Sequence, residues 1–280
     1  MNVRVAEKCG FCPGVRNAIN LAKKTLEKAD VVYSLGPIIH NEDVVRQLAQ
    51  SGLHTVSRID EVDQGTVLIR SHGATSAELE EIQKKGLNVV DATCVLVKRV
   101  QKIARLLHDE GYHVIIIGDK NHPEVKAVVG SASGVDVVGV EADLSKLSKR
   151  KKLGIICQTT QSPDYFAQML AAIARGGFEE IKVINTLCRE TMQRQEAAVK
   201  LCRQVDIMFV LGGLHSANTR KLAELCNKHN SQTFHLQNWQ ELDTTLLAGK
   251  QTAGVTAGAS TPDEVINAFV RNLQAYPAGS

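Results

Sequence analysis

Short runs of β-branched and other apolar residues alternate along the chain with longer segments in which apolar residues recur at helical spacing. The short runs predict strands, and the segments between most of them, such as residues 15–29, predict amphipathic helices. The predicted strands are residues 31–36, 65–71, 87–93, 113–118, 135–140, 153–159, 181–186, 207–212, 232–236 and 252–258. This alternation of strand and helix favours parallel sheets covered by helices, an α/β fold.

The predicted elements follow one plan three times: a strand, a cysteine, a helix, a strand that ends in glycine, and then a polar residue. The interval from cysteine to glycine is 24 residues in each copy, from Cys12 to Gly36, from Cys94 to Gly118 and from Cys188 to Gly212. The interval from the same cysteines to the polar residue is 28 residues, which leads to His40, His122 and Ser216. Intervals that repeat without slippage indicate an internal structural repeat.

A further strand in each copy ends in a polar turn, and we expect these turns to place His72, Thr159 and Ser260 in corresponding positions. Ser162 and Thr261, each followed by proline, are predicted helix N-caps. Ligands of open parallel sheets bind beyond the carboxyl ends of the strands. Every polar residue named so far follows such an end.

The strand before each cysteine belongs to the preceding copy, so residues 2–7 should complete the last one. We therefore expect three α/β units with small, mainly parallel sheets, arranged pseudo-threefold around a central cluster cavity. The predicted units are residues 14–93, 94–187 and 188–280, the last completed by the N-terminal strand within residues 1–13.

Composition narrows the class of protein. Of the 280 residues, 44% are hydrophobic and 22% charged, which is typical of a globular protein, and the net charge of +3 is too small to indicate nucleic-acid binding. The one dense basic run, residues 149–152, is interpreted as a solvated loop. No stretch reaches the roughly 18 apolar residues of a membrane span, and the N-terminus lacks a signal-peptide core. We expect a cytoplasmic protein without a nucleic-acid or membrane partner, whose seven cysteines stay reduced.

One thiolate from each copy, meeting on the repeat axis, would give three soft ligands. Structural zinc normally has four ligands, whereas a [4Fe–4S] cluster held by three cysteines keeps one iron open as a Lewis acid for a substrate oxygen. Cys9 is an alternative fourth ligand because Cys9 and Cys12 have a metal-like spacing, although the other copies have no counterpart. The remaining cysteines are interpreted as buried packing residues, namely Cys157, Cys202 and Cys226.

The polar residues at the strand ends suit an anion. Hydrogen-bond donors near helix N-termini favour phosphate oxygens, so a compact phosphorylated or diphosphate ligand is expected. The candidate residues are His40, His72, His122, Thr159, Ser216, Asn218 and Ser260. A metal role for the histidines is the competing interpretation. Glu124 is either a proton donor that acts through Thr159 or an exposed glutamate in the first turn of a helix.

Several motifs carry a resemblance that runs in order over nearly the whole chain: GFCPGV, GPIIHNEDVV, IRSHG, VDATCVLV, GDKNHPEVKAVVG, QTTQS, CRETMQRQEA, HSANTRKL and VTAGASTPD. Together they resemble the 4-hydroxy-3-methylbut-2-enyl diphosphate reductase family. The resemblance implies reductive dehydroxylation of that allylic diphosphate to isopentenyl and dimethylallyl diphosphate, the last step of the non-mevalonate isoprenoid pathway. It also implies a [4Fe–4S] cofactor and an external electron donor such as ferredoxin or flavodoxin.

Carried over motif by motif, the resemblance gives the cysteines Cys12, Cys94 and Cys188 as cluster ligands and Glu124 as the proton donor. It implies that Thr159 orders the substrate hydroxyl and that the diphosphate is held by His40, His72, His122, Ser216, Asn218 and Ser260. Where some members have Ser-Ser-Asn, this chain has Ala217 in the middle, which removes one hydroxyl. The alternatives are another three-cysteine cluster enzyme, such as an aconitase-like dehydratase or a quinolinate-synthase-like enzyme, and a non-catalytic iron or zinc sensor.

Overall fold

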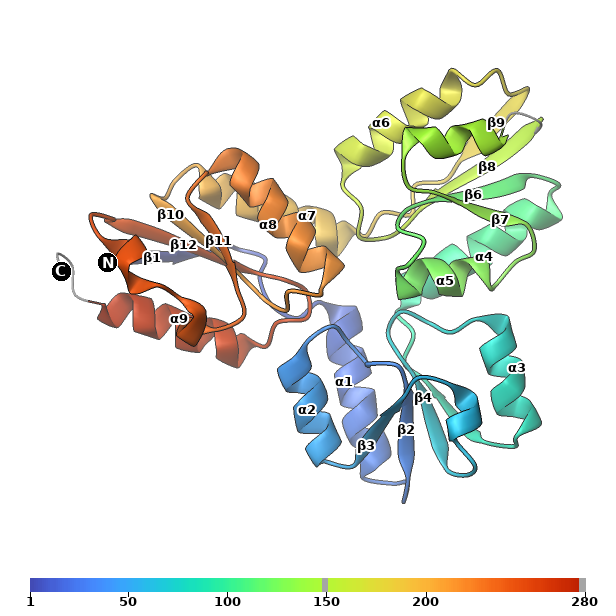
Figure 1. The fold of residues 1–280 in the computed structure, drawn as a ribbon, viewed down its shortest axis with the longest axis horizontal. Helices are drawn as coiled ribbons and strands as arrows, with labels where there is room; N and C mark the ends of the chain where they lie inside the picture. The colour runs from blue at the N-terminus through green and yellow to red at the C-terminus, as the bar shows by residue number, and fades with distance from the viewer. Residues whose placement is uncertain (148–150, 277–280) are drawn as a thin grey trace. The chain divides into compact units, whose positions relative to one another are not determined.

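The computed structural model describes residues 1–147 and 151–276, and it contains three small sheets whose strand pairs are all parallel (Figure 1). The first sheet has the order β3 (Leu53–Val56), β2 (Val32–Leu35), β4 (Thr66–Ile69), β5 (Asn88–Asp91). The second has the order β7 (Val135–Val138), β6 (His113–Ile117), β8 (Lys152–Cys157), β9 (Glu180–Val183). The third has the order β11 (Thr233–Leu236), β10 (Ile207–Leu211), β12 (Thr252–Ala257), β1 (Asn2–Val5).

Helices connect the strands of every sheet. They are α1 (Pro13–Leu26), α2 (Glu42–Gln50), α3 (Ser76–Lys84), α4 (Val95–Asp109), α5 (Pro123–Val129), α6 (Pro163–Ala174), α7 (Arg189–Cys202), α8 (Ala217–His229) and α9 (Asp263–Ala275). Short 3-10 helices cover Ile59–Glu61, Glu141–Leu147, Trp239–Glu241 and Thr244–Leu247. The predicted α/β fold of three small parallel sheets is confirmed.

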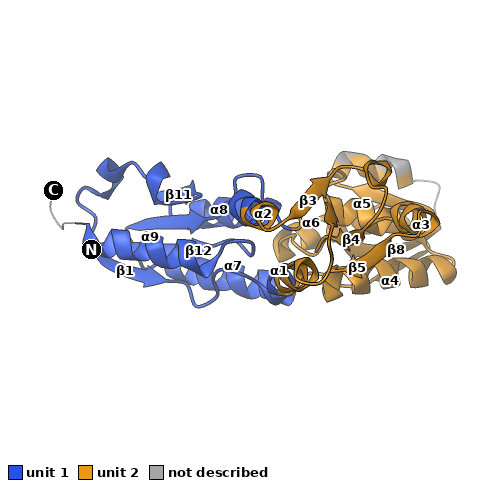
Figure 2. Cartoon of the chain, turned by 90° about the horizontal axis from the view of Figure 1, so that it is seen from below, with its two compact units in different colours: residues 1–16, 39–46, 189–280 blue, residues 17–38, 47–188 orange. Residues whose placement is uncertain are grey.

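The chain forms two compact units (Figure 2). Unit 1 comprises residues 1–16, 39–46 and 189–280 and contains the third sheet. Unit 2 comprises residues 17–38 and 47–188 and contains the first two sheets. The limits expected for three units and their threefold arrangement stay predictions.

The two central strands of each sheet are the most deeply buried. All residues of β4 and β10 are buried, as are those of β8 after its first residue, while β1, β5 and β9 lie at sheet edges and are largely exposed. This burial explains why the central strands are nearly continuous apolar runs. In the first two sheets the chain leaves the two central strands toward opposite edges, so the carboxyl ends of these strands flank a topological switch point, where α/β sheets bind ligands. The third sheet has the same strand arrangement, but its edge beside β12 is the N-terminal strand β1, and β12 leads only to α9.

The repeated glycines lie at the carboxyl ends of central strands, and close neighbours account for two of them. A Cβ atom on Gly36 would overlap the Arg70 guanidinium, and a Cβ on Gly118 would lie 2.8 Å from the Gln158 side chain. Arg70 and Gln158 are the first residues after β4 and β8. The glycine of the repeat therefore makes room for the side chain that follows the neighbouring central strand.

Three details of the sequence interpretation need correction. Residues 53–56 were not predicted as a strand but form β3. Thr261 is not the N-cap of α9, because Pro262 holds that position and the Thr261 hydroxyl donates to the Leu211 carbonyl at 3.0 Å. The predicted cap at Ser162 is confirmed, since its Oγ accepts the Tyr165 N–H at 3.2 Å.

The third correction concerns register. His72 and Ser260 lie three residues beyond the ends of β4 and β12, whereas Thr159 lies only two residues beyond the end of β8. Thr159 therefore corresponds to Ser71 and Ala259, and Thr160 takes the position of His72 and Ser260.

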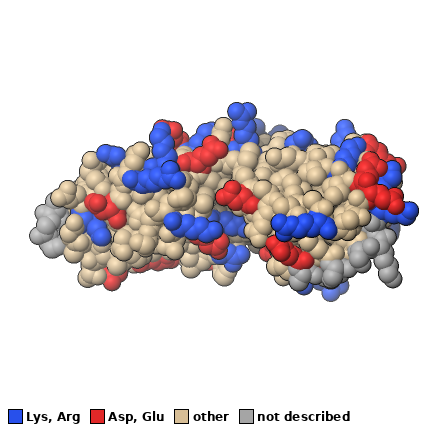
Figure 3. All heavy atoms as spheres, turned by 90° about the horizontal axis from the view of Figure 1, so that it is seen from above, with Lys and Arg blue, Asp and Glu red and all other residues tan. Residues whose placement is uncertain are grey.

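Surface charge is mixed in sign. On the face drawn in Figure 3, lysine and arginine side chains are interspersed with aspartate and glutamate. Part of the predicted basic loop, residues 149–150, lies outside the described residues, and Lys151 and Lys152 pair with Glu179 and Glu180. No helix in the described part of the chain is long and apolar enough to cross a membrane.

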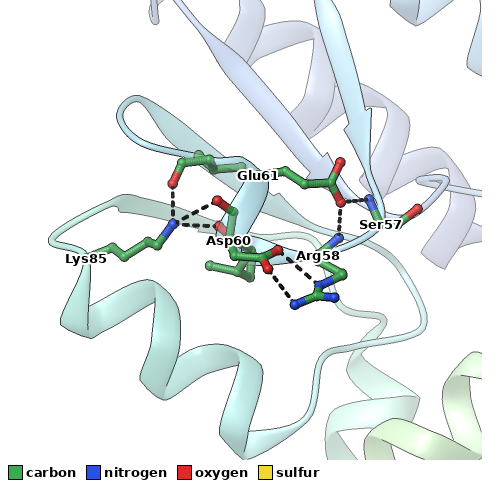
Figure 4. Close-up of polar contacts among 7 residues, drawn as sticks. Ser57, Arg58, Asp60, Glu61 and Lys85 are labelled. Atoms are coloured by element: carbon green, nitrogen blue, oxygen red, sulfur yellow. Dashed lines mark hydrogen bonds and ion pairs between the residues drawn. The ribbon is translucent and has the colours of Figure 1, made fainter.

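A separate polar network ties the connection between β3 and β4 to the end of α3 (Figure 4). The Lys85 ammonium donates to the carbonyls of Ile59, Asp60 and Val62 at 3.1, 3.2 and 2.8 Å. Glu61 accepts from two backbone amides at the start of the same turn, at 3.1 and 2.7 Å. The Lys85 and Glu61 side chains both form hydrogen bonds with backbone groups, so we assign the network a structural role.

Candidate active site

The three cysteines of the repeat all lie at the start of a helix. Cys94 is the N-cap of α4, and Cys12 and Cys188 directly precede α1 and α7. None of the seven cysteines is in a disulfide. The N-terminus of a helix is a favourable place for a negatively charged group.

The backbone of each cysteine is held in the same way. The Cys12 N–H donates to the Ala259 carbonyl at 3.2 Å, the Cys94 N–H to Ser71 at 2.9 Å, and the Cys188 N–H to Thr159 at 2.9 Å. Each acceptor lies two residues beyond the end of the central strand β12, β4 or β8. This bond anchors every cysteine beyond the carboxyl end of a central strand.

The donor set suits an iron–sulfur cluster. Free thiols at helix N-termini match the thiolate ligands that such clusters require, and the Val15 N–H lies 3.4 Å from the Cys12 sulfur, within reach of a weak hydrogen bond. Cys12 belongs to unit 1, and Cys94 and Cys188 belong to unit 2. A common ligand set of the three stays a prediction.

The other cysteines are packing residues in this structure. Cys157, Cys202 and Cys226 are buried, which confirms their interpretation. Cys9 packs against the apolar core of unit 1, and its burial raises the pKa of its thiol to about 11. Because a ligand must be a thiolate, this environment disfavours Cys9 as a fourth ligand.

Glu124 is a buried carboxylate that contacts Thr159 through both of its oxygens. Its side chain is only 2% exposed, so the alternative of an exposed first-turn glutamate is wrong. Oε1 accepts the Thr159 N–H and Oε2 accepts the Thr159 hydroxyl, both at 2.7 Å. The carbonyl of the same threonine accepts the Cys188 N–H. Within unit 2, Thr159 therefore binds both the candidate proton donor Glu124 and the candidate cluster ligand Cys188.

His122 and His72 pack against each other at the start of α5, the helix that contains Glu124. His122 is the N-cap of α5, and its Nδ1 accepts the Glu124 N–H at 3.2 Å, which leaves Nε2 as the protonated nitrogen in the neutral ring. The His72 and His122 rings meet edge to face, with centroids 5.6 Å apart. In unit 2, contacts thus link His72 to His122, His122 to the Glu124 backbone, and the Glu124 carboxylate to Thr159.

The remaining candidates lie in unit 1. Ser216 is the N-cap of α8 and accepts the Thr219 N–H at 3.3 Å, and Asn218 follows in the first turn. The Ser260 hydroxyl donates to the His40 carbonyl at 3.1 Å, and a Cβ on Gly213 would lie 3.1 Å from that same oxygen. These contacts hold the backbone of His40 against the carboxyl ends of β10 and β12.

Some buried polar groups of unit 1 lack a hydrogen-bond partner among the described residues, including the Thr219 and Thr256 hydroxyls and the Asn218 amide. The Asn218 Nδ2 atom is buried and has no hydrogen-bond acceptor among the residues that the structure describes. An unmade hydrogen bond of a buried donor costs about 1–3 kcal/mol. A bound acceptor such as a phosphate oxygen would remove that cost.

Arg70 was missed by the sequence interpretation. Its guanidinium lies over Gly36 at the first switch point, its Nε is buried without an acceptor among the described residues, and burial lowers its pKa. The sequence feature that could have identified Arg70 is its position directly after β4, which is the position that Gln158 occupies after β8.

Comparison with known proteins gives one consistent result. Residues 3–274 match the family described as LytB protein. The chain is 42% identical over 278 residues to the 4-hydroxy-3-methylbut-2-enyl diphosphate reductase of Geobacter sulfurreducens, covering 99% of this chain and 98% of the relative. It is 43% identical over 275 residues to the reductase of the same name from Geobacter metallireducens, covering 98% and 97%.

Two solved structures agree in fold. One is (E)-4-hydroxy-3-methyl-but-2-enyl diphosphate reductase, the terminal enzyme of the non-mevalonate pathway, with 40% identity, a TM-score of 0.74 and coverage of 98% and 99%. The other is the E-1-hydroxy-2-methyl-but-2-enyl-4-diphosphate reductase from Plasmodium falciparum, with 29% identity, a TM-score of 0.92 and coverage of 99% and 89%. The chain therefore belongs to the LytB family, the oxidoreductase family of the 4-hydroxy-3-methylbut-2-enyl diphosphate reductases.

Proposed function

We propose that this chain reduces 4-hydroxy-3-methylbut-2-enyl diphosphate to isopentenyl and dimethylallyl diphosphate. The reaction removes the allylic hydroxyl as water and consumes two electrons and two protons. Membership of the reductase family supports the substrate and the reaction. The observation that carries the mechanism is the contact of Glu124 with Thr159, whose backbone also binds Cys188.

We assign the cofactor to Cys12, Cys94 and Cys188, which would hold a [4Fe–4S] cluster with one iron open to the substrate. When bound, the cluster would supply Lewis-acid chemistry and single-electron transfer. The anchoring of all three cysteine amides and their place at helix N-termini support this ligand set. The electrons would come from an external carrier such as ferredoxin or flavodoxin.

Glu124 delivers the proton in this proposal. Hydroxide is a poor leaving group, so protonation of the departing oxygen lowers the barrier. A protonated Glu124 would donate through the Thr159 hydroxyl, which lies 2.7 Å from Oε2 and can both accept and donate. The Thr159 N–H on Oε1 fixes the carboxyl plane, so the acid is oriented before substrate arrives.

The diphosphate is assigned to donors at the strand ends. His72 and His122 in unit 2, and His40, Ser216, Asn218 and Ser260 in unit 1, form the proposed binding set. The unpartnered Asn218 Nδ2 supports an acceptor in the bound state, and the N-terminus of α8 adds backbone N–H groups that favour anions. Ala217 contributes only its backbone.

The test is anaerobic turnover with chemically reduced viologen as the electron source. Protein purified without oxygen should contain iron and acid-labile sulfide in equal amounts, about four of each per chain, and should convert the allylic diphosphate to both five-carbon products. A colourless protein with stoichiometric zinc, or one that holds the cluster but leaves the substrate unchanged, would overturn the proposal.

A further inference from the structure

The solvent-facing side of α4 differs from the side that packs on the sheet. Val97, Val100, Ala104 and Leu107 form its buried stripe. On the opposite side, at helical spacing, lie Val95, Lys98, Arg99, Lys102, Arg105 and Leu106, all exposed. We call these six residues the α4 face. From Val95 to Leu106 the face extends about 16 Å along the helix.

The α4 face combines positive charge with exposed apolar surface. Val95 is 76% exposed and Leu106 49%. The face has four cations, of which Lys98 pairs with Asp91 at 2.6 Å. The first turn of α4 contains no acidic residue, and the one acidic residue on this side of the helix is Asp109 at its end. Apolar groups flanked mainly by charge of one sign are typical of sites for a protein partner of opposite charge.

The chain contains its own comparison for this face, because α1 and α7 occupy the same place in the repeat. The residue after the cysteine is Pro13 in α1 and Arg189 in α7. In α7 the first turn contains Glu190, and the middle of the helix is largely buried around Arg194. The equivalent side of α1 is also basic, with Arg16, Lys23 and Lys24 exposed beside the exposed Pro13, but a lysine stands there at the position of Leu106. A face with four cations and two exposed apolar residues therefore occurs in α4 and in neither equivalent helix.

We propose that the α4 face is the docking surface for an acidic one-electron carrier protein. This inference rests on the proposed function, which requires two electrons per turnover from outside the chain. Val95 is bonded to Cys94, a proposed cluster ligand, so a carrier bound on this face is brought next to the electron acceptor. Each docking event transfers one electron, so two events complete a turnover. The apolar residues and the lack of aromatic residues favour a protein over nucleic acid.

The test uses two charge-matched variants of the holoenzyme and a small acidic [2Fe–2S] protein as the probe. The first variant is Arg99→Glu with Lys102→Glu in the α4 face. The control is Lys23→Glu with Lys24→Glu in α1, which changes the net charge equally at exposed positions of the equivalent helix. The Kd for the probe, the KM for the reduced probe and viologen-driven turnover are measured for each protein.

We expect the α4 variant to raise both the Kd and the KM for the probe at least tenfold and to flatten their salt dependence, because docking charges act mainly through steering. Viologen-driven turnover should stay within twofold for both variants, and the control should bind the probe as the parent does. Equal weakening in the control, unchanged binding in the α4 variant, or preferential binding of a short nucleic acid on this face would overturn the inference. If the parent binds the probe through this face but cannot turn over with viologen, the docking surface stands and the proposed function fails.

Discussion

Replacing Glu124 with glutamine tests whether the buried carboxyl group is an acid or only a structural acceptor. In the Glu124→Gln variant the amide oxygen can still accept the Thr159 N–H, and the amide nitrogen can donate to the Thr159 hydroxyl, so both contacts of 2.7 Å can be kept. The loss is the difference between charge-assisted and neutral hydrogen bonds, about 1–2 kcal/mol of folding free energy. A general acid contributes about 100- to 10,000-fold to a rate. That corresponds to about 2.7–5.4 kcal/mol of activation free energy.

The loss of folding free energy and the loss of catalytic rate can be separated because they are measured in different assays. We expect Glu124→Gln to keep its iron and sulfide, to lower the free energy of unfolding only slightly, and to lose at least about 99% of viologen-driven turnover. Glu78→Gln is the matched control, since Glu78 accepts both the N–H and the hydroxyl of Thr75, at 2.6 and 2.8 Å, in the capping box of α3. It should retain full turnover.

Two results would refute the reasoning. Turnover of the Glu124→Gln variant above a tenth of the parent would remove Glu124 from the proton path. Loss of the cluster in that variant would show that the contact through Thr159 to Cys188 is structural. Glu124→Ala adds a check, because it leaves the buried Thr159 N–H without its acceptor and should lower stability by a further amount of about 1–3 kcal/mol.

Three further outcomes follow from the structure. Cys188→Ser should lose most of the iron, whereas Cys9→Ser should keep it, as measured by anaerobic metal analysis. Ser162→Ala removes the cap that accepts the Tyr165 N–H and should lower stability by about 1 kcal/mol, visible in thermal unfolding without loss of activity. The neutral Cys9 thiol has a pKa of about 11 when folded against 9.0 ordinarily, so the stability that it contributes is present below pH 9 and is lost as the pH rises to about 11. The midpoint of thermal unfolding should therefore fall over that window by more in the parent than in a Cys9→Ala variant.

The repeat made the fold predictable because its spacing reflects sheet geometry. A Cβ on Gly36 or Gly118 would displace the side chain that follows the neighbouring strand, and Gly36 also has a φ of +72°, so the interval from the cysteine is constrained. The strand β3 was missed because only Leu53 and Val56 of its four residues are apolar. The register could have revealed it, since Leu53 follows Gly36 by the same 17 residues that separate Val135 from Gly118.

Side-chain contacts were less predictable than the backbone. The motif after β8 contains two adjacent threonines, and periodicity alone does not say which one corresponds to His72. The burial of Glu124 was also hidden, because a first-turn glutamate after His122 and Pro123 is equally typical of an exposed helix start. Its position becomes clear only when the end of β8 is placed beside α5, which is a tertiary contact.

Comparison of the three sheets shows which contacts follow from the repeated backbone and which contact is specific to one sheet. The position two residues beyond the central strand binds a cysteine amide through its carbonyl in every sheet, so the side chain there is free to vary. It is serine after β4, threonine after β8 and alanine after β12. Only Thr159 meets a carboxylate at this position among the described residues, because α5 has a glutamate, Glu124, at its second residue. Backbone symmetry thus accounts for three equivalent cysteine positions, and a single departure from that symmetry accounts for one carboxylate linked through Thr159 to one of these cysteines.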